Sequence, residues 1–440
     1  MPDAREVARL QAAAVDWVQG GTLGSIAAAG GELVHQVLLE LMHAERRTEP
    51  FWRYRADALL REPTAALLQA LIKLRVPKRE LKLAEETVFP GEEQALDAIV
   101  TNMGAYMVQR FKPGEYERAG NTKTHGVVRA EVTIREDLPR ELRQGVFREK
   151  RTFPAYVRFS GPGPDTPADI DDVGFMSMSV KLMGVQGPKL LDDERHTQDF
   201  LSVCTPTFVT PNVVVNQRLH AQSLRRTPLY YFFDPRQTHI LDFLMQSLWN
   251  ETQTSPLECQ YYSCTPFLLG EGRAMQFSFK PRSDARSRIP NLPARPPDNY
   301  LRENMAATLA KQECVFDMLI QPQTDPYAMP IEDAGVRWPQ SLSPYVPAAT
   351  IRIPMQQFDS PAQIRFAKAL SYNPWHCVPE HRPLGSLNRA RRRMYWELSR
   401  IRLARNGTPP IEPTGQEVFD DVPASEADGG SHDAWTRARA

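Results

Sequence analysis

The sequence predicts an α+β protein, in which an antiparallel β-barrel is flanked by helices and preceded by a helical arm. Apolar and polar residues alternate at 128–134, 176–182, 275–279 and 350–353, which is the period of half-buried strands. Outside this strand-rich zone, which runs to about residue 355, the apolar spacing is mostly helical. So many short strands pair most naturally around a closed or nearly closed antiparallel sheet.

The helical spacing before the strands defines the first boundary. Residues 1–90 are expected to form the N-terminal helical arm, because apolar residues such as Leu33, Val37 and Leu41 recur at three- and four-residue steps. Residues 91–359 would then form the barrel core. Within that core, 211–250 is expected to be largely helical and the proline-rich stretch 281–298 to be a wrapping loop.

The end of the chain divides into two further segments. Residues 360–406 are expected to be a C-terminal helical segment, whose first helix begins with Ser360 as N-cap and Pro361 at the first position. That helix should end before Asn373. Residues 407–440 are rich in Pro, Gly, Asp and Glu, and this composition predicts a disordered tail.

Charge and hydropathy limit the partners and the location. The chain has 53 Lys+Arg and 53 Asp+Glu, so no overall charge favours nucleic acid or an anionic membrane, although 389–405 is locally rich in arginine. No apolar run reaches the roughly 18 residues of a membrane span, and the first thirty residues do not have the pattern of a secretory signal. We therefore expect a cytoplasmic protein with no membrane span.

The cysteines agree with a reducing compartment. The five cysteines are odd in number and have no paired CxxC spacing, so neither a disulfide framework nor a structural zinc site is indicated. Reduced thiols are expected at Cys204, Cys259, Cys264, Cys314 and Cys377.

Two motifs near the C-terminus carry the chemistry. The first reads Ser371-Tyr372-Asn373-Pro374-Trp375-His376, and the second reads Glu380-His381-Arg382-Pro383-Leu384-Gly385. Together they supply a phenol, an indole, two imidazoles and an arginine, the side chains of a cofactor pocket rather than of a solvated loop. Upstream, Arg118 and the run Val157-Arg158-Phe159-Ser160 complete the set.

In their order and spacing these motifs resemble those of the catalase superfamily, most closely the bacterial catalase-like haem-binding proteins, over about residues 90–405. The resemblance implies one haem b per chain. Arg118, Arg158 and Arg382 would bind its propionates, since a guanidinium is planar and always charged. Phe159 belongs to the same Arg-Phe-Ser strand motif, and segment 360–406 would close the proximal haem side.

Tyr372 is the first choice of iron ligand under this resemblance. An arginine earlier on the same helix normally lowers the pKa of the ligating tyrosine, and Arg365 is placed for that role although its spacing of seven differs from the family spacing of four. His376 is the competing ligand, or else a core imidazole beside Trp375. Absence of haem also stays open.

The distal side departs from the family pattern. Asn121 stands where relatives carry the catalytic histidine, and an amide cannot shuttle the proton of a peroxide. Cys204 or Val203 stands where relatives carry an asparagine. Efficient hydrogen peroxide dismutation should therefore be lost unless His125 takes over. Structural roles remain open for Asn121 in a turn, for His125 at a strand start and for Cys204 as a small buried hydrophobe.

The resemblance implies a haem-dependent, catalase-like oxidoreductase or isomerase acting on a peroxide or small organic substrate. The alternatives are a weak catalase or peroxidase that uses His125, and a non-enzymatic haem-binding protein. A homo-oligomer assembled through the arm is expected. A lipocalin-like barrel with Tyr372 and Trp375 as pocket walls is disfavoured, because an apolar ligand gives no reason to gather three arginines.

Overall fold

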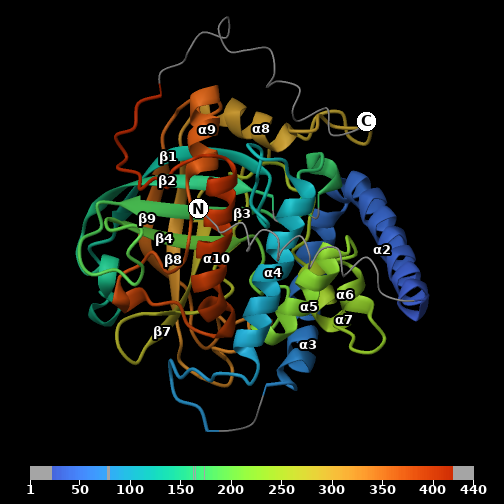
Figure 1. Cartoon of the computed structure of the whole chain (residues 1–440). Coiled ribbons are helices and arrows are strands. Elements are labelled where there is room, and N and C mark those ends of the chain that lie inside the picture. Colours follow the sequence, from blue (N-terminus) through green and yellow to red (C-terminus); the bar gives the residue numbers. More distant parts are fainter. Residues whose placement is uncertain (1–21, 77–79, 162, 164, 173, 420–440) are drawn as a thin grey trace, which may run out of the picture.

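The computed structural model describes residues 22–76, 80–161, 163, 165–172 and 174–419. Helices α2, α3, α5, α6 and α7 gather on one side of a β-barrel, with α4 next to the barrel, whereas α8 and α9 lie over the top of the barrel in the view of Figure 1. The α-helices are α2 (Thr22–Thr48), α3 (Arg53–Lys73), α4 (Glu92–Arg110), α5 (Val213–Leu224), α6 (Tyr230–Phe233), α7 (Ile240–Ser247), α8 (Tyr300–Leu309), α9 (Pro361–Ala369) and α10 (Ser386–Arg405).

Short 3₁₀ helices lie between these elements: η1 (Glu49–Phe51), η2 (Arg140–Leu142), η3 (Gly145–Phe147), η4 (Asp169–Asp171) and η5 (Pro379–His381). The strands are β1 (Thr124–Ile134), β2 (Thr152–Ser160), β3 (Ser177–Met183), β4 (Thr197–Val203), β5 (Tyr261–Tyr262), β6 (Phe267–Leu268), β7 (Ala274–Pro281), β8 (Cys314–Pro322) and β9 (Val346–Ile353).

The sheet closes on itself. Its strand order is β5-β4-β3-β2-β1-β9-β8-β7-β6, and an additional pairing of β5 with β7 joins the two ends. The pairs within the ring are antiparallel. Closure leaves the ring without unpaired edge strands, and it makes every strand alternate between an inward and an outward face. The predicted antiparallel barrel with flanking helices is confirmed.

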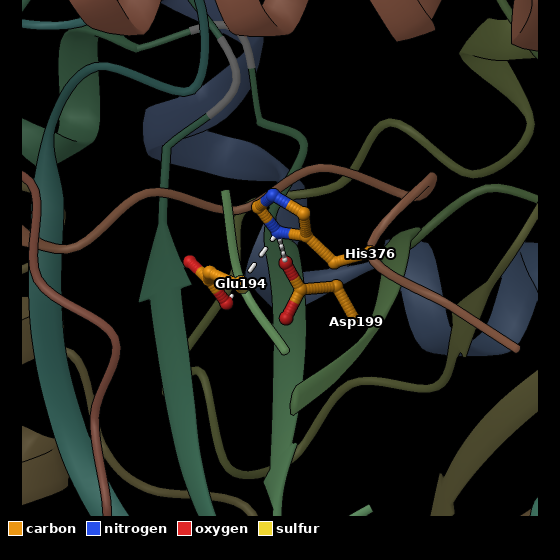
Figure 2. A group of neighbouring side chains, drawn as sticks. All are labelled: Glu194, Asp199 and His376. Atoms are coloured by element: carbon orange, nitrogen blue, oxygen red, sulfur yellow. Dashed lines mark hydrogen bonds and ion pairs between the residues drawn. The ribbon is translucent and has the colours of Figure 1, made fainter. Parts of the chain in front are cut away.

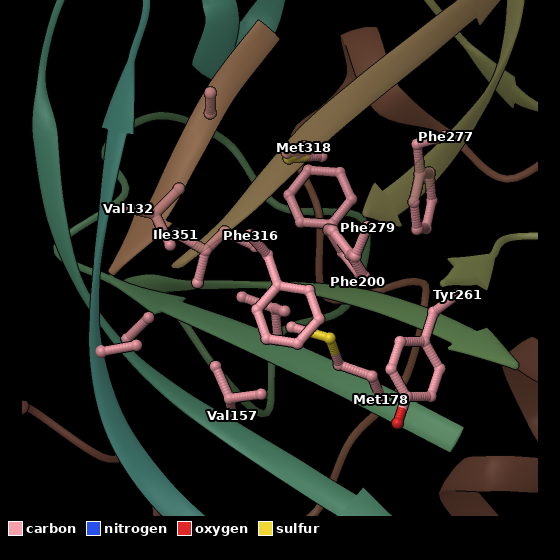
Figure 3. Close-up of a cluster of buried hydrophobic side chains, with 14 of the residues drawn as sticks. Val132, Val157, Met178, Phe200, Tyr261, Phe277, Phe279, Phe316, Met318 and Ile351 are labelled. Atoms are coloured by element: carbon pink, nitrogen blue, oxygen red, sulfur yellow. The ribbon is translucent and has the colours of Figure 1, made fainter. Parts of the chain in front are cut away.

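The inside of the barrel is a packed apolar core (Figure 3). Phe200 and Phe277 lie with their ring centroids 5.2 Å apart in an edge-on arrangement, and Phe279 follows at 5.4 Å from Phe277. Phe159 and Phe316 join the same cluster. Since aromatic and branched side chains here are almost fully buried, their removal from water is the main stabilising contribution to the barrel.

The outer face of β1 to β4 carries the residues that matter for function. In the register of the sheet, Val127 lies beside Arg158, and Arg158 lies beside Ser179. In the next outward row, Tyr156 lies beside Lys181, and Lys181 beside Asp199. Charged groups thus occupy two neighbouring outward rows, and the C-terminal segment covers them.

Helix α9 begins as the sequence predicted. The Ser360 hydroxyl accepts from the main-chain N–H of Gln363, the Gln363 side chain accepts from the N–H of Ser360, and Pro361 occupies the first turn. This reciprocal capping box satisfies two N–H groups that the helix start would otherwise leave unpaired. The helix ends at Ala369, before Asn373 as expected.

Two further expectations can be compared with the structure. Residues 22–73 of the predicted arm are largely helical, whereas residues 1–21 lie outside the described part. Residues 407–419, assigned from composition to a disordered tail, instead pack on the barrel: Glu417 accepts a 2.8 Å hydrogen bond from the Tyr156 hydroxyl, and Phe419 contacts Phe366. Residues 420–440 are outside the described residues. None of the described helices combines the length and apolarity that a bilayer span needs.

Candidate functional site

Two arginines donate hydrogen bonds to the C-terminal end of α9. Nη2 of Arg118 and Nη2 of Arg402 both donate to the main-chain carbonyl of Leu370, at 2.5 and 3.0 Å. Arg118 also donates to the carbonyl of Ala367 at 3.3 Å, and Arg402 to that of Lys368. The last carbonyls of a helix lack partners within the helix and carry partial negative charge, so these two cations cap α9.

Arg158 approaches the same place from β2. Its guanidinium donates to the Ser160 hydroxyl at 2.8 Å, to the Thr124 hydroxyl at 2.8 Å and to the main-chain carbonyl of Asn121 at 2.6 Å. Asn121 is in the left-handed region, with φ of 49°, which asparagine tolerates better than most residues. Arg158 therefore fixes the turn that leads into β1, and Asn121 takes part through its backbone.

Tyr372 lies next to these arginines, three residues beyond α9. Its ring packs with Val127, Tyr156 and Leu370 on the outer face of the barrel, and its buried hydroxyl has no hydrogen-bond partner. Burial raises the pKa of the Tyr372 phenol above its usual range, although the positive charge of Lys181 opposes this shift. The Lys181 ammonium is 5.3 Å from the centre of the ring.

We call Arg118, Arg158 and Arg402 the arginine group. Within the described chain, none of the three forms an ion pair with a carboxylate. Burial lowers the pKa of all three guanidiniums, and for Arg158 the repulsion of Arg118 adds to this effect. Nη1 of Arg118 and Nε of Arg158 are buried without a partner. The charge of Glu117 opposes this lowering of the pKa, although Glu117 is ion-paired with Lys368 rather than with an arginine of the group. Buried cations without a direct ion pair are costly, and a further anionic group is their natural complement.

His125 is buried at the start of β1. Its Nδ1 is 3.8 Å from Oδ1 of Asp169, which is held at 2.6 Å by the Lys123 ammonium, and its Nε2 has no partner. Burial and then the charge of Lys123 hold the pKa of His125 well below its usual range, so the imidazole is neutral. It borders a cavity of about 20 Å³ that also touches Val127 and Ala367.

The side chains of Cys204 and Phe159 point into the barrel interior, away from Tyr372. Both belong to the apolar core inside the barrel, so the sheet separates them from Tyr372. The Cys204 sulfur accepts a hydrogen bond from the N–H of Met176 at 2.9 Å, and burial raises the pKa of its thiol to about 12. Cys204 is thus a protonated, buried thiol, in agreement with the small-hydrophobe alternative.

Of the arginines expected near the haem, Arg365 and Arg382 do not lie beside Tyr372. Arg382 is on a different part of the molecule, where its Nη1 pairs with Glu86 at 2.6 Å. Arg365 is exposed on α9, so it does not serve the phenol of Tyr372. Arg402 takes a place beside Arg118 that sequence motifs did not assign. Its only signal was membership of the arginine-rich run 389–405, which also contains surface arginines.

A second ionic cluster lies one outward row away, and we call it the lysine group: Lys181, Asp193, Glu194, Asp199 and His376. Figure 2 shows His376 pointing at the carboxylates of Glu194 and Asp199. Its Nδ1 is 2.9 Å from Oδ2 of Asp199 and its Nε2 is 3.1 Å from Oδ1 of Asp193. The Lys181 ammonium pairs with Glu194 and, at 2.8 Å, with Oδ1 of Asp199.

Glu194, Asp199 and His376 are close enough to hold a metal ion, with ligand atoms within 4.8 Å of one another. Lys181 already supplies a positive charge to both carboxylates, however, and the group is complete as an ion-pair network. Both ring nitrogens of His376 are engaged. Burial and Lys181 oppose protonation of His376, but hydrogen bonds to Asp193 and Asp199 raise its pKa to about 9.

The lysine group also anchors the C-terminal motif. The N–H of Asn373 donates to Oδ2 of Asp199 at 2.9 Å, and the N–H of Asp199 donates to the carbonyl of His376 at 2.8 Å. The Trp375 indole donates to the carbonyl of Asn388 at 2.6 Å, on α10. Residues 373–376 therefore fasten the segment after Tyr372 to β4 and α10, which is a structural task.

The arrangement of most of the chain is shared with solved catalases. A fungal catalase matches 81% of this chain and 73% of its own length, with a TM-score of 0.54 and 16% identity. Catalase A from Saccharomyces cerevisiae matches 81% and 75%, with a TM-score of 0.52 and 14% identity. No protein-family model and no curated protein matches the sequence. At these identities the likeness establishes the catalase fold.

Proposed function

We propose that this chain binds haem b and acts as an oxidoreductase or isomerase on an organic peroxide or another small organic substrate. The observation that carries the proposal is the convergence of Arg118 and Arg158 beside Tyr372, each with a buried polar atom that lacks a partner. Buried polar groups in proteins are almost always hydrogen-bonded. Two guanidiniums suit two carboxylates, and a phenol suits ferric iron.

The donor set fits haem, but the enclosed space beside it is small. The cavity next to His125 measures about 20 Å³, whereas cofactor pockets span roughly 300–1,000 Å³. Tyr372 also packs directly against Val127 of β1. Haem binding therefore requires α9 and the segment through Tyr372 to move away from β1, and release of the two arginine caps on α9 would accompany that movement.

Each residue of the site has a distinct task under this proposal. Haem, when bound, supplies the redox chemistry of its iron. Arg118 and Arg158 would hold its carboxylates, and Tyr372 would provide the phenolate ligand. Before that movement the Lys181 ammonium is 5.3 Å from the ring, and a nearby positive charge favours the ionised phenol, which the exposed Arg365 does not provide.

The remaining groups explain why hydrogen peroxide is not the expected substrate. Dismutation needs a residue that accepts a proton from the peroxide and returns it. The Asn121 amide cannot do so, and the Cys204 thiol is on the inner side of the sheet. His125 is neutral but buried, with its Nδ1 directed to a carboxylate that Lys123 already neutralises. An organic peroxide can instead be oriented by apolar contacts without a double proton transfer.

The test is peroxide turnover by haem-reconstituted protein. We expect cumene hydroperoxide to be consumed faster than hydrogen peroxide. The Asn121→His variant should increase hydrogen peroxide dismutation by at least about 100-fold, since general acid–base catalysis typically contributes that much. Histidine also tolerates the left-handed backbone at this position.

The alternatives predict different results in the same assay. Rapid hydrogen peroxide dismutation that His125→Gln abolishes would replace the proposal with a weak catalase. Tight haem retention with no turnover of either peroxide would replace it with a non-enzymatic haem-binding protein. If the protein takes up no haem, the proposal that it is a haem protein is wrong.

We also propose that the protein is a cytoplasmic homo-oligomer. The helices of the arm expose large apolar side chains: Leu33 is 66% exposed and Leu41 63% on α2, and Leu59 is 75% exposed on α3. Leu33, Val37 and Leu41 follow one another at four-residue steps, so these exposed side chains share one face of α2, and an exposed apolar face of this kind can serve as an interaction surface. All five cysteines are free and buried, which agrees with a reducing compartment.

A further inference from the structure

Residues 407–419, which we call the strap, follow α10 and cross the outer face of the barrel to reach α9. The Glu412 carboxylate accepts hydrogen bonds from the main-chain N–H groups of Arg195 and His196, at 2.7 and 2.5 Å, in the loop that leads into β4. Gly415 has φ of 85°, and a Cβ there would lie only 2.9 Å from a side chain of β3. This part of the strap is therefore seated closely on the barrel.

Charged side chains fix the end of the strap on β1 and β2. Oε2 of Glu417 accepts a 2.8 Å hydrogen bond from the Tyr156 hydroxyl, and the main-chain carbonyl of Glu417 accepts from the Arg129 guanidinium. The same guanidinium lies 5.4 Å from the ring centre of Phe419, within the range of a cation–π interaction. Hydrogen bonds with a charged partner are stronger than neutral ones, so these contacts set the position of Phe419 on the barrel.

Phe419 in turn contacts α9. Its ring centroid is 5.2 Å from that of Phe366 on α9, and the Phe366 ring is 5.1 Å from that of Tyr156 on the barrel. Phe366 also packs against the apolar cluster that contains Leu370 and Tyr372. A pair of aromatic rings at this distance stabilises a contact beyond the area that it buries, so Phe419 holds α9 against the barrel next to Tyr372.

The strap therefore restrains the segment that has to move before haem can enter. Binding at the arginine group requires α9 and the residues through Tyr372 to leave β1, because the enclosed space beside them measures only about 20 Å³. If α9 moves alone, Phe366 separates from Phe419. If the strap moves with α9, Glu417 loses its bond to the barrel. Either movement costs contacts that a chain without the strap would not have to break.

We propose that the strap holds α9 closed over the arginine group, and that its release from α9 sets the rate at which haem reaches the site. This inference rests on the function proposed above, since haem is the molecule admitted. Arg118 and Arg402 anchor the C-terminal end of α9 independently of the strap, so loss of the strap contact loosens α9 without unfolding it. Restraint of one helix beside an intact barrel is the arrangement of a gate, and opening of a gate can limit association.

The first experiment needs no haem and measures native-state hydrogen exchange of α9 in the full-length protein. Phe419→Ala removes the contact with Phe366, and Val418→Ala is the matched control, because Val418 is the neighbouring residue and is 81% exposed. Exchange of the α9 amides should be at least about tenfold faster in Phe419→Ala and within about twofold of the wild type in Val418→Ala. Equal exchange in the two variants would overturn the proposal. Unfolding midpoints show that both variants are folded.

The second experiment measures the rate of haemin binding, followed by the Soret band after rapid mixing. Haemin should associate at least about tenfold faster with Phe419→Ala than with the wild type, and at a rate within about twofold of the wild type with Val418→Ala. Equal association rates for the wild type and Phe419→Ala would overturn the gating role and leave the haem site in place. If neither the wild type nor the variants bind haemin, the proposed function is wrong and the gating role falls with it, even where hydrogen exchange shows that the strap restrains α9.

Discussion

The arginine group and the lysine group occupy neighbouring outward rows of the same barrel face, yet their charges are balanced in opposite ways. In the lysine group, Lys181 and His376 meet three carboxylates within hydrogen-bond distance. In the arginine group, the guanidiniums bond to carbonyls and hydroxyls. A complete ion-pair network needs no further partner, whereas buried cations that form no direct ion pair among the described residues still have a favourable interaction to make. On the function proposed above, this difference distinguishes a structural cluster from a binding site.

The largest effect should follow from breaking the lysine group. Lys181→Met leaves the buried carboxylates of Glu194 and Asp199 without their main counter-charge, so we expect a loss of about 3–5 kcal/mol in the free energy of unfolding. Chemical denaturation measures it. Lys150→Met is the matched control, because Lys150 forms an exposed pair with Glu136 and should change stability little. Similar losses in both variants would mean that the lysine group is not a stability element.

Stability should also depend on the ionisation of His376. Its pKa is about 9 in the folded protein, against about 6.5 for an unperturbed histidine. Because the folded value is the higher one, this contribution is fully present below about pH 6.5 and is lost as pH rises through about 9. The destabilisation caused by His376→Gln should therefore shrink by about 3 kcal/mol between pH 6 and pH 10. A pH-independent difference would show that His376 stays neutral.

Removal of an arginine should cost less than removal of the lysine. Arg158→Met deletes hydrogen bonds to Asn121 and Thr124, but it also removes a buried cation that Arg118 repels. We expect the two effects to offset each other to within about 2 kcal/mol of unfolding free energy. A loss as large as that of Lys181→Met would place Arg158 among the structural residues.

The smallest effect concerns the thiol inside the barrel. Because burial raises the pKa of Cys204 to about 12, the native protein should react with a thiol reagent such as dithionitrobenzoate only as fast as it unfolds. Adding denaturant should make the Cys204 thiol react rapidly with the reagent. Rapid labelling of Cys204 in the native protein, detected by peptide mass spectrometry, would contradict its assignment to the core.

Much of the fold could be predicted from the sequence because its signals are local. Two-residue alternation at 128–134 and 176–182 predicted strands that became β1 and β3. Ser360 and Pro361 predicted the start of α9. Composition misjudged residues 407–419, since a polar, proline-rich segment can still dock when single residues such as Glu417 and Phe419 find partners on a barrel.

The site was less predictable, because its members come from distant parts of the chain. Motif order identified Arg118, Arg158 and Tyr372, which the structure places side by side. It could not show that Arg382 pairs with Glu86, or that Arg402 joins Arg118 at the end of α9. Those contacts depend on where helices pack, and single-residue patterns do not encode that.

The most direct test of the account is a haemin titration followed by the Soret band, comparing Arg158→Met with Arg382→Met. Both arginines belong to the sequence motifs, but only Arg158 lies beside Tyr372, while Arg382 is ion-paired elsewhere. The account predicts saturable haemin binding that weakens at least about tenfold in Arg158→Met and is nearly unchanged in Arg382→Met. Equal affinities for the wild type and Arg158→Met, or a loss confined to Arg382→Met, would contradict the assignment of the arginine group as the binding site.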